Sequence, residues 1–151
     1  MIAGKVEAIQ IAAEAAAPME EVAEVEAVGG HGLAGDRYHK GVGTFSHIPK
    51  PRGVTLIEAE ALAAVNQGGL PLNYAECRRN IITSGVALNE LVGREFQVGS
   101  VTLRGIELCE PCDHLAGLAG KPLIAPLVHR GGLRAEVVSS GTIRRGDSLS
   151  S

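Results

Sequence analysis

Two thiols set three positions apart are the most reactive groups that this chain offers. Cys109 and Cys112 enclose the dipeptide Glu110-Pro111, in a chain with three cysteines in all. A basic, glycine-rich stretch, His129–Arg134, follows further along the chain. The thiolate rather than the thiol attacks sulfur and binds metals, and neighbouring cationic groups favour the thiolate. The pattern therefore indicates a sulfur atom kept as thiolate beside a site for an anionic ligand.

Cys112 is the better candidate of the two for chemistry. Pro111 suits the first position of a helix, because the missing N–H of proline costs nothing there. A helix N-terminus at this point, with Arg130 and Arg134 nearby, would lower the thiol pKa from its ordinary value of about 8.5. The thiolate could then accept a persulfide sulfur and pass it on, or ligate a soft metal. Cys109 ends an apolar strand, and its role stays open; for both cysteines, burial without chemistry is the alternative.

Structural zinc is a second interpretation of the same residues. Cys109 and Cys112 have the spacing of zinc ligands, and His114 and His129 would complete a tetrahedral set. The chain has no second C-x-x-C and no close histidine pair, so half of that signal is missing. A thioredoxin-like redox pair is weaker still, because the βα context is absent. Cys77 is interpreted as a small core residue.

A second group of residues is suited to holding an anion. Arg78 and Arg79 offer planar guanidinium forks that match phosphate geometry, and Asn80 adds an amide for orientation. A solvated strand edge is the alternative interpretation of these three residues. His129 is a further candidate because it precedes Arg130 and two glycines, where the backbone can approach a ligand.

The stretch 29–53 is too long for a simple connection, and such loops tend to be functional. Its histidines, glycines and prolines show no period. His31 and Arg37 are candidates for the rim of the same pocket. In the alternative interpretation, Asp36 pairs with Arg37 or caps a turn.

Composition narrows the function classes. The chain has 151 residues, which fits a single domain over 1–151. It has no Trp and 3% aromatic residues, so the core must be aliphatic and aromatic stacking platforms for single-stranded nucleic acid are not expected. A net charge of −3 also argues against nucleic-acid binding. No membrane span and no signal peptide are expected, so we predict a cytoplasmic location where thiols stay free.

Short strands separated by glycine must position these residues. Many short strands that seldom alternate with helices favour a mainly β, barrel-like domain over a doubly wound sheet. The Ala-rich run 12–17 could be helical, but Pro18 and the alternation that follows favour a turn between two strands. Helices are expected at 58–66, before Gly68-Gly69, and near 112–118 and 121–127, with a single turn at 88–93. Strands are expected at 6–11, 22–28, 54–57, 79–83, 95–98, 101–108, 133–139 and 142–149, with hairpins at 99–100 and 140–141.

The stretch Gly30–Gly35 matches the dinucleotide fingerprint G-x-G-x-x-G. That motif works at the N-terminus of a helix within a βαβ unit. The residues that follow, 36–43, have no apolar helical face and contain two more glycines. A dinucleotide site is therefore not expected.

The order of the motifs resembles the MOSC family, named for the C-terminal domain of molybdenum cofactor sulfurase. No single motif is decisive, but together they span nearly the whole chain in order. The matching pieces are Gly32–Tyr38, Val54–Ile57 with Glu60, Arg78–Ile81, Leu88–Phe96, Cys109–Cys112, Arg130–Ala135 and Gly141–Asp147.

The resemblance implies a twisted β-barrel of the pyruvate-kinase-like type with a few short helices. It also implies a role around the molybdenum cofactor (molybdopterin). Cys112 is then the residue expected to carry sulfur or to bind molybdenum directly. Arg78 and Asn80 are expected to help hold the pterin phosphate, with Arg130, His129 and Arg37 as further cofactor-binding candidates.

The resemblance leaves the activity open between sulfur handling, cofactor binding and catalysis. One alternative is a small molybdenum-dependent reductase of N-hydroxylated compounds, as some family members are, which would need an electron-donor protein. Another is a noncatalytic β-barrel binding module. The extra N-terminal β-barrel domain of the larger members is not expected here, nor is pyridoxal phosphate held by this domain alone. A sulfur donor or a molybdoenzyme is the partner expected for sulfur handling; the oligomeric state stays open.

Overall fold

The computed structural model describes residues 3–13, 17–36, 53–67, 69, 73–109 and 131–150. Strands predominate in this part of the chain, and two α-helices and one 3-10 turn accompany them. The strands are β1 (Ala3–Ile11), β2 (Glu20–Val22), β3 (Glu24–Val28), β4 (Gly32–Leu33), β5 (Val54–Glu58), β6 (Ile81–Ser84), β7 (Glu95–Val98), β8 (Val101–Leu108), β9 (Leu133–Val137), β10 (Gly141–Arg144) and β11 (Ser148–Ser150). The helices are α1 (Ala59–Gln67) and α2 (Tyr74–Cys77), and the 3-10 turn η1 spans Leu88–Leu91.

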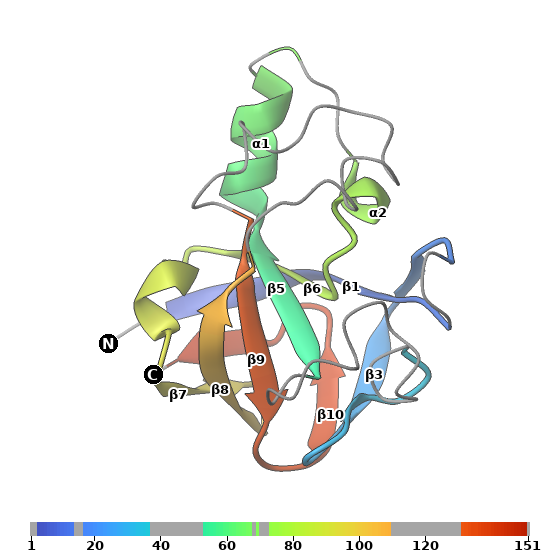
Figure 1. The fold of residues 1–151 in the computed structure, drawn as a ribbon, viewed down its shortest axis with the longest axis vertical. Coiled ribbons are helices and arrows are strands. Elements are labelled where there is room, and N and C mark those ends of the chain that lie inside the picture. Colours follow the sequence, from blue (N-terminus) through green and yellow to red (C-terminus); the bar gives the residue numbers. More distant parts are fainter. Residues whose placement is uncertain are drawn as a thin grey trace.

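Seven of the strands close into a barrel (Figure 1). They follow one another in the order β11-β7-β8-β9-β5-β6-β1, and β1 pairs with β11 to complete the ring. β2 extends the sheet beyond β1, while β10, β3 and β4 form a second, smaller sheet. Closing the ring removes the unpaired strand edges that an open sheet would expose. The expected mainly β, twisted-barrel fold with few short helices is confirmed.

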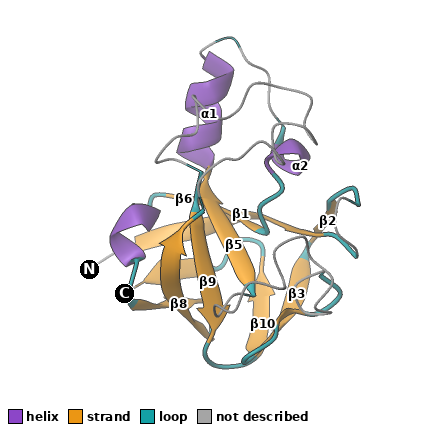
Figure 2. Cartoon of the chain, viewed as in Figure 1, coloured by secondary structure: helices purple, strands orange, loops and turns teal. Residues whose placement is uncertain are grey.

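The two helices lie together at one end of the barrel (Figure 2). They belong to the connection between β5 and β6, which pair in parallel. Parallel neighbours cannot be joined by a tight hairpin and need a crossover, which usually contains a helix. The crossover therefore explains why helical structure appears at this end. No helix among the described residues is long and apolar enough to cross a lipid bilayer.

The barrel interior is filled by aliphatic side chains, as the scarcity of aromatic residues predicts. Alternate residues of β8 and β9 point inward, and Phe96 is the aromatic member of the cluster. A second, smaller cluster lies under the helices, where both faces of β5 and β6 are buried. Its buried members are Ala8, Ile57, Leu62, Val65, Cys77 and Ile82.

Local sequence patterns placed most of these elements closely. The β7–β8 hairpin has the predicted bounds, and its turn lies at Gly99-Ser100. α1 is shifted by one residue at both ends from its predicted range, and β5 extends one residue beyond its predicted end. The four glutamates of β2 and β3 are exposed and form a solvated face. For the run 12–17, residues 14–16 lie outside the described residues, as do the helices expected near 112–118 and 121–127.

The predicted pairing of the last two strands is wrong. The run 142–149 divides into β10 and β11 at a turn where Gly146 has a φ of 93° and the backbone N–H of Asp147 donates to the carbonyl of Arg144. β10 then pairs with β3, β11 pairs with β1 and β7, and β9 pairs with β5 and β8. Closing the barrel thus separates strands that are neighbours in the sequence.

Candidate functional site

Four barrel strands reach the same level at the end that the helices cover. Leu56 of β5 is paired with Ile81 of β6 and with Leu133 of β9. Leu133 is in turn paired with Leu108 of β8. Residues that precede β6 and β9, or that follow β8, are therefore brought together although they lie far apart in the sequence.

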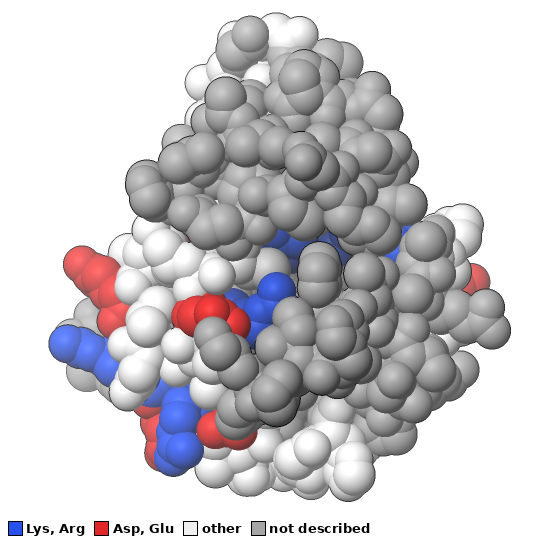
Figure 3. Space-filling model, viewed as in Figure 1, with Lys and Arg blue, Asp and Glu red and all other residues white. Residues whose placement is uncertain are grey.

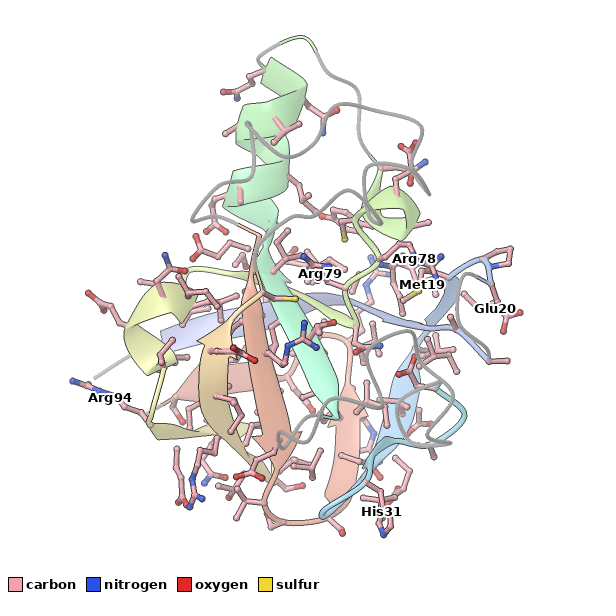
Figure 4. The ribbon with its side chains drawn as sticks, viewed as in Figure 1. Met19, Glu20, His31, Arg78, Arg79 and Arg94 are labelled. Atoms are coloured by element: carbon pink, nitrogen blue, oxygen red, sulfur yellow. The ribbon has the colours of Figure 1, made fainter. Side chains whose placement is uncertain are left out.

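Arg79 lies where these strand ends meet, two residues before β6. Its side chain lies between the barrel and the helices (Figure 4) and is 7% exposed. The Nε atom donates to the carbonyl of Gly131 at 2.8 Å, and Nη2 donates to the carbonyl of Cys109 at 2.9 Å. One guanidinium thus bridges the first cysteine of the C-x-x-C pair and Gly131, within the basic stretch.

Arg134 brings a second guanidinium to Cys109. Its Nη2 lies 3.5 Å from the Sγ of Cys109, and its Nε lies 3.8 Å from a carboxylate oxygen of Glu107. Cys109 itself is a free, buried cysteine with 5% exposure. Arg134 therefore lies beside the first cysteine of the pair, and the expectation that it also lies near Cys112 stays a prediction. Basic side-chain atoms also reach the surface near the middle of the face in Figure 3.

The glycine between these groups has a steric reason. Gly132 has a φ of 110°, and a Cβ built on it would stand 1.9 Å from the carbonyl oxygen of Leu56. Its own carbonyl accepts the backbone N–H of Cys109 at 2.7 Å. Only glycine lets the chain approach β5 this closely while it also pairs with Cys109.

Cys77 is a core residue, as expected from the sequence. It is fully buried in the cluster under the helices, and its thiol donates to the carbonyl of Tyr74 at 2.9 Å. Burial raises the pKa of this thiol, although the backbone N–H and the charge of Arg79 act in the opposite direction. The group therefore stays a neutral thiol near neutral pH.

Arg78 turns away from Arg79. It ends α2 in the left-handed conformation with a φ of 56°, and its Nη1 donates to the carbonyl of Ala17 at 2.6 Å. Figure 4 shows its side chain directed towards Met19, near the connection between β1 and β2. Two consecutive arginines thus serve different parts of the molecule. The predicted contact of Arg78 with a pterin phosphate stays a prediction.

Asn80 is the centre of a buried network of hydrogen bonds, the polar node, which joins it to Thr55, Gln10 and Asp36. Its Oδ1 accepts the N–H and the hydroxyl of Thr55, at 3.0 and 3.1 Å. Its Nδ2 donates to the carbonyl of Gln10 at 3.1 Å and to Asp36 Oδ1 at 3.2 Å. Two donors and two acceptor positions are what a side-chain amide has, so all four are used inside the protein. A ligand contact from Asn80 stays a prediction, and it would have to displace one of these bonds.

The loop candidates separate in space. Asp36 is fully buried, and besides Asn80 its Oδ1 accepts the backbone N–H of Ala12 at 3.0 Å. His31 is exposed in the turn before β4, at the opposite end of the barrel from Arg79 (Figure 4). The structure thus separates His31 from Arg79, and a place for His31 at the rim of the predicted pocket stays a prediction.

A hollow beside the start of α2 has no counterpart in the sequence predictions. Its volume is about 510 Å³, and it lies between the β1–β2 region and the first turn of α2. Gln10 lines the hollow, and its side-chain amide donates to the carbonyls of both Tyr74 and Arg79. The other lining residues are Met19, Glu21, Asn73, Tyr74 and Ala75. They come from three separate segments and form no motif that a sequence could reveal.

Comparison with known proteins agrees with this architecture. A model described as the MOSC domain matches residues 43–150. The chain belongs to the MOSC family. The match includes the strand ends that meet at Arg79 and the whole stretch from Cys109 to Arg134.

Solved structures of three bacterial proteins share the fold of this MOSC domain. The crystal structure of YuaD from Bacillus subtilis has a TM-score of 0.81 and 17% identity, over 98% of this chain and 94% of that one. YiiM from Geobacillus stearothermophilus has a TM-score of 0.70 and 14% identity, over 97% and 74%. YiiM from Escherichia coli has 0.66 and 18%, over 97% and 68%. At such identities the likeness shows the fold alone. None of the curated proteins matches this chain.

Several predicted residues of this MOSC domain lie outside the described residues. They are Cys112, the proposed catalytic residue and metal ligand, with Arg37, His129 and Arg130. His114, which the zinc interpretation needs, is outside as well. Within the described part of the chain, no group of three or more His, Cys, Asp or Glu residues is arranged to hold a metal ion.

Proposed function

We propose that this MOSC domain handles sulfur or binds the molybdenum cofactor through the thiolate of Cys112, at the helix-covered end of the barrel. The observation that supports the proposal best is the meeting of two guanidinium groups at Cys109. Arg79 donates to its carbonyl and Arg134 lies 3.5 Å from its sulfur. Clustered positive charge beside a pair of cysteines is the environment in which a thiolate is favoured.

Cys112 follows Cys109 by three residues in the sequence. Consecutive Cα atoms are about 3.8 Å apart, so the Cα of Cys112 can lie no more than about 11 Å from that of Cys109. At the other end of the same segment, Arg130 is bonded directly to Gly131, whose carbonyl accepts from Arg79. Both predicted residues therefore lie within three positions in the sequence of a carbonyl that accepts from Arg79.

Sulfur transfer at Cys112 needs no external oxidant or reductant. The thiolate attacks the terminal sulfur of a donor persulfide, a new S–S bond forms, and the S–S bond of the donor breaks. The donor leaves as a thiolate, and Cys112 then holds a persulfide. A cationic surrounding favours the anions on both sides of this exchange. The partner is then a protein that carries persulfide sulfur, or the acceptor that receives it.

The residues present also fit the molybdenum cofactor in charge and donor type. The cofactor carries a phosphate and sulfur ligands, which suit guanidinium forks and a thiolate. Arg79, Arg134 and the predicted Arg130 would hold anionic groups, and Cys112 would supply the sulfur ligand. When bound, the cofactor supplies redox chemistry at molybdenum. Arg78 and Asn80 are already engaged with Ala17 and with the buried polar node, so we give them a smaller part in binding.

The test compares Cys112→Ala with the matched variant Cys77→Ala. Protein is purified from its own host and assayed for cyanide-labile sulfur, molybdenum and pterin, and circular dichroism checks that each variant is folded. We expect Cys112→Ala to lose all three signals and Cys77→Ala to keep them, because Cys77 is a buried, neutral thiol. Equal content in wild type and Cys112→Ala would contradict the proposal. If the cofactor is present, turnover of N-hydroxylated bases with a reductase partner separates the reductase alternative from sulfur carriage.

A further inference from the structure

The hollow beside the start of α2 is built from residues of three segments. Gln10 belongs to β1, Met19 precedes β2 and Glu21 belongs to it, and Asn73–Ala75 form the start of α2. Its volume of about 510 Å³ falls within the range of roughly 300–1,000 Å³ that is usual for small-molecule sites. Neither Arg79 nor Arg134 is among its described lining residues, so the hollow is not the place where guanidinium groups meet Cys109.

Gln10 brings a buried amide oxygen to the hollow. The residue is 2% exposed, and both hydrogens of its amide are used, by the carbonyl of Tyr74 at 2.8 Å and by that of Arg79 at 3.0 Å. These two bonds fix the plane of the amide and leave Oε1 as its remaining polar atom. Within the part of the chain that the structure describes, no group donates to Oε1. A buried acceptor without a donor is unfavourable, so a ligand N–H at this oxygen would lower the free energy.

Glu21 lies opposite Gln10 in the sheet. The two residues are directly paired across β1 and β2, so their side chains leave the same face of the sheet with Cβ atoms about 5 Å apart. Glu21 is exposed, and its carboxylate makes no hydrogen bond or ion pair with another described residue. A neutral acceptor and an anionic acceptor thus lie side by side, one buried and the other open to solvent.

Charge at the hollow favours a cation over an anion. Glu21 is the charged residue among the described lining residues. Arg78 is directed towards Met19 in Figure 4, but it is not one of those lining residues, and its Nη1 donates to the carbonyl of Ala17. An anion would therefore face the carboxylate of Glu21, whereas the N–H groups of a cation would find both acceptors.

The other walls suit an apolar body. Met19 offers a flexible thioether, and the ring of Tyr74, which is 37% exposed, offers an aromatic face. Aromatic faces attract cations, and a thioether adapts to irregular shapes. Asn73 uses its Oδ1 to accept the N–H of Glu76, which fixes the first turn of α2 and with it the place of Tyr74.

We propose that this hollow binds a small organic cation, an amidine or an amine with a short apolar body. The N–H groups of the ligand donate to Oε1 of Gln10 and to the carboxylate of Glu21, and its body lies against Met19 and the ring of Tyr74. This binding site depends neither on Cys112 nor on the proposed function.

The first test titrates the full chain with benzamidine, a planar cation with an apolar ring, and with benzamide, its neutral counterpart of nearly the same shape. Two-dimensional NMR follows the backbone amides of Glu21 and Tyr74 and the side-chain amide of Gln10. We expect saturable shifts at these three residues and a dissociation constant for benzamidine that is lower than that for benzamide by about fivefold or more. The absence of saturable shifts, shifts confined to other residues, or equal affinity for the two probes would overturn the proposal.

The second test removes the charge of Glu21. Glu21→Gln keeps the shape of the side chain and should bring the two dissociation constants to within about twofold of each other. Glu20→Gln is the matched control, because Glu20 is exposed on the same strand and its side chain points to the opposite face. It should leave the preference for benzamidine unchanged. Equal effects of the two variants would show that general negative charge attracts the probe, and would overturn the assignment of the hollow.

A third probe distinguishes a free ligand from a side chain of another protein. Nα-acetyl-arginine amide represents such a side chain, and we expect it to bind more weakly than benzamidine. Tighter binding of this probe would assign the hollow to a protein contact and overturn the small-molecule proposal. Cys112→Ala should bind benzamidine as the wild type does, so this result and the sulfur and cofactor assays of the proposed function are independent.

Discussion

Two glycine-rich turns at opposite ends of β5 look alike in the sequence and differ in what surrounds them. Gly32 has a φ of 118°, and a Cβ there would stand 2.5 Å from the carbonyl oxygen of Gly53, just before β5. Gly132 has a φ of 110° and packs against the carbonyl of Leu56 within β5. Both glycines are needed because two backbones approach each other closely.

Only one of the two turns has guanidinium groups and a thiol beside it. Around Gly132 lie two guanidiniums and the sulfur of Cys109, all near the helix-covered end. The other turn presents the exposed His31 on the far side of the barrel (Figure 4). Glycine spacing therefore reports where backbones meet, and buried charge beside a thiol distinguishes the turn with a candidate function. The dinucleotide-like spacing of Gly30–Gly35 is explained in this way, because Gly32, at the start of β4, packs closely against the backbone of Gly53.

The largest effect is expected from Gly132→Ala. The new methyl group would overlap the carbonyl of Leu56 and force β9 and β5 apart, besides straining a positive φ. We expect a loss of about 4 kcal/mol or more in the free energy of unfolding, measured by urea denaturation.

Gly30→Ala is the control for that experiment. Its φ is 78°, and among the described residues nothing stands within 4 Å of the added Cβ. Only the backbone strain remains, so the expected loss is about 1 kcal/mol. Similar losses for the two variants would mean that close approach of backbones is not what distinguishes Gly132.

Asn80→Ala tests the connection between the two regions, because Asn80 directly follows Arg79 and its side-chain amide donates to Asp36, at the end of the first turn. The variant leaves the buried Asp36 Oδ1, the Gln10 carbonyl and the Thr55 N–H each short of a partner. We expect a loss of about 3 kcal/mol in the free energy of unfolding. Thr83→Val should lower the free energy of unfolding by less, because the buried hydroxyl that it removes donates a single hydrogen bond, to the carbonyl of Ile57. An equal or smaller loss for Asn80→Ala would contradict the assignment of Asn80 as a structural node.

The smallest effect concerns pH and the thiol of Cys77. Because burial raises its pKa in the folded protein, the unfolded chain loses this proton first, near its ordinary pKa of 9.0. The stability that depends on the protonated thiol is therefore complete below pH 9 and falls as the pH rises towards the folded pKa. The slope is at most about 1.4 kcal/mol per pH unit.

Cys77→Ala isolates this contribution. The difference in unfolding free energy between wild type and Cys77→Ala should be constant below about pH 8 and should shrink above pH 9. Urea denaturation at a series of pH values measures it. A difference that stays constant up to pH 10.5 would show that the folded protein does not disfavour the Cys77 thiolate.

Elements with a strong local pattern were predicted well. β8 alternates buried and exposed residues, and a Gly-Ser turn precedes it, so both the strand and the β7–β8 hairpin were found with their bounds. Likewise α1 has apolar residues at helical spacing and a glycine after its end. Such features depend on residues within one turn or one hairpin, and local propensity and periodicity determine them.

Site residues were predicted less well. Arg78, Arg79 and Asn80 were grouped as one anion-holding set, but their side chains have different partners. Arg78 donates to the carbonyl of Ala17, and Arg79 to the carbonyls of Cys109 and Gly131. Asn80 donates to the carbonyl of Gln10 and to Asp36. The left-handed backbone of Arg78 redirects the chain between the first two, and nothing in the residue types announces it. The role of Arg79 was missed as well, because its partners are carbonyls of residues far along the chain.

The amino-acid sequence by itself determined that this protein is a mainly β MOSC domain with an aliphatic core and a pair of cysteines near a basic stretch. Those properties follow from composition, periodicity and motif order, which are written along the chain. Only the tertiary structure decided that Arg79 and Arg134 meet at Cys109. It also decided that the side chain of Asn80 makes all its hydrogen bonds inside the protein, and that His31 lies at the other end of the barrel from Arg79. Barrel closure sets these distances, because it depends on pairing between strands that are remote in sequence, such as β5 with β9 and β1 with β11.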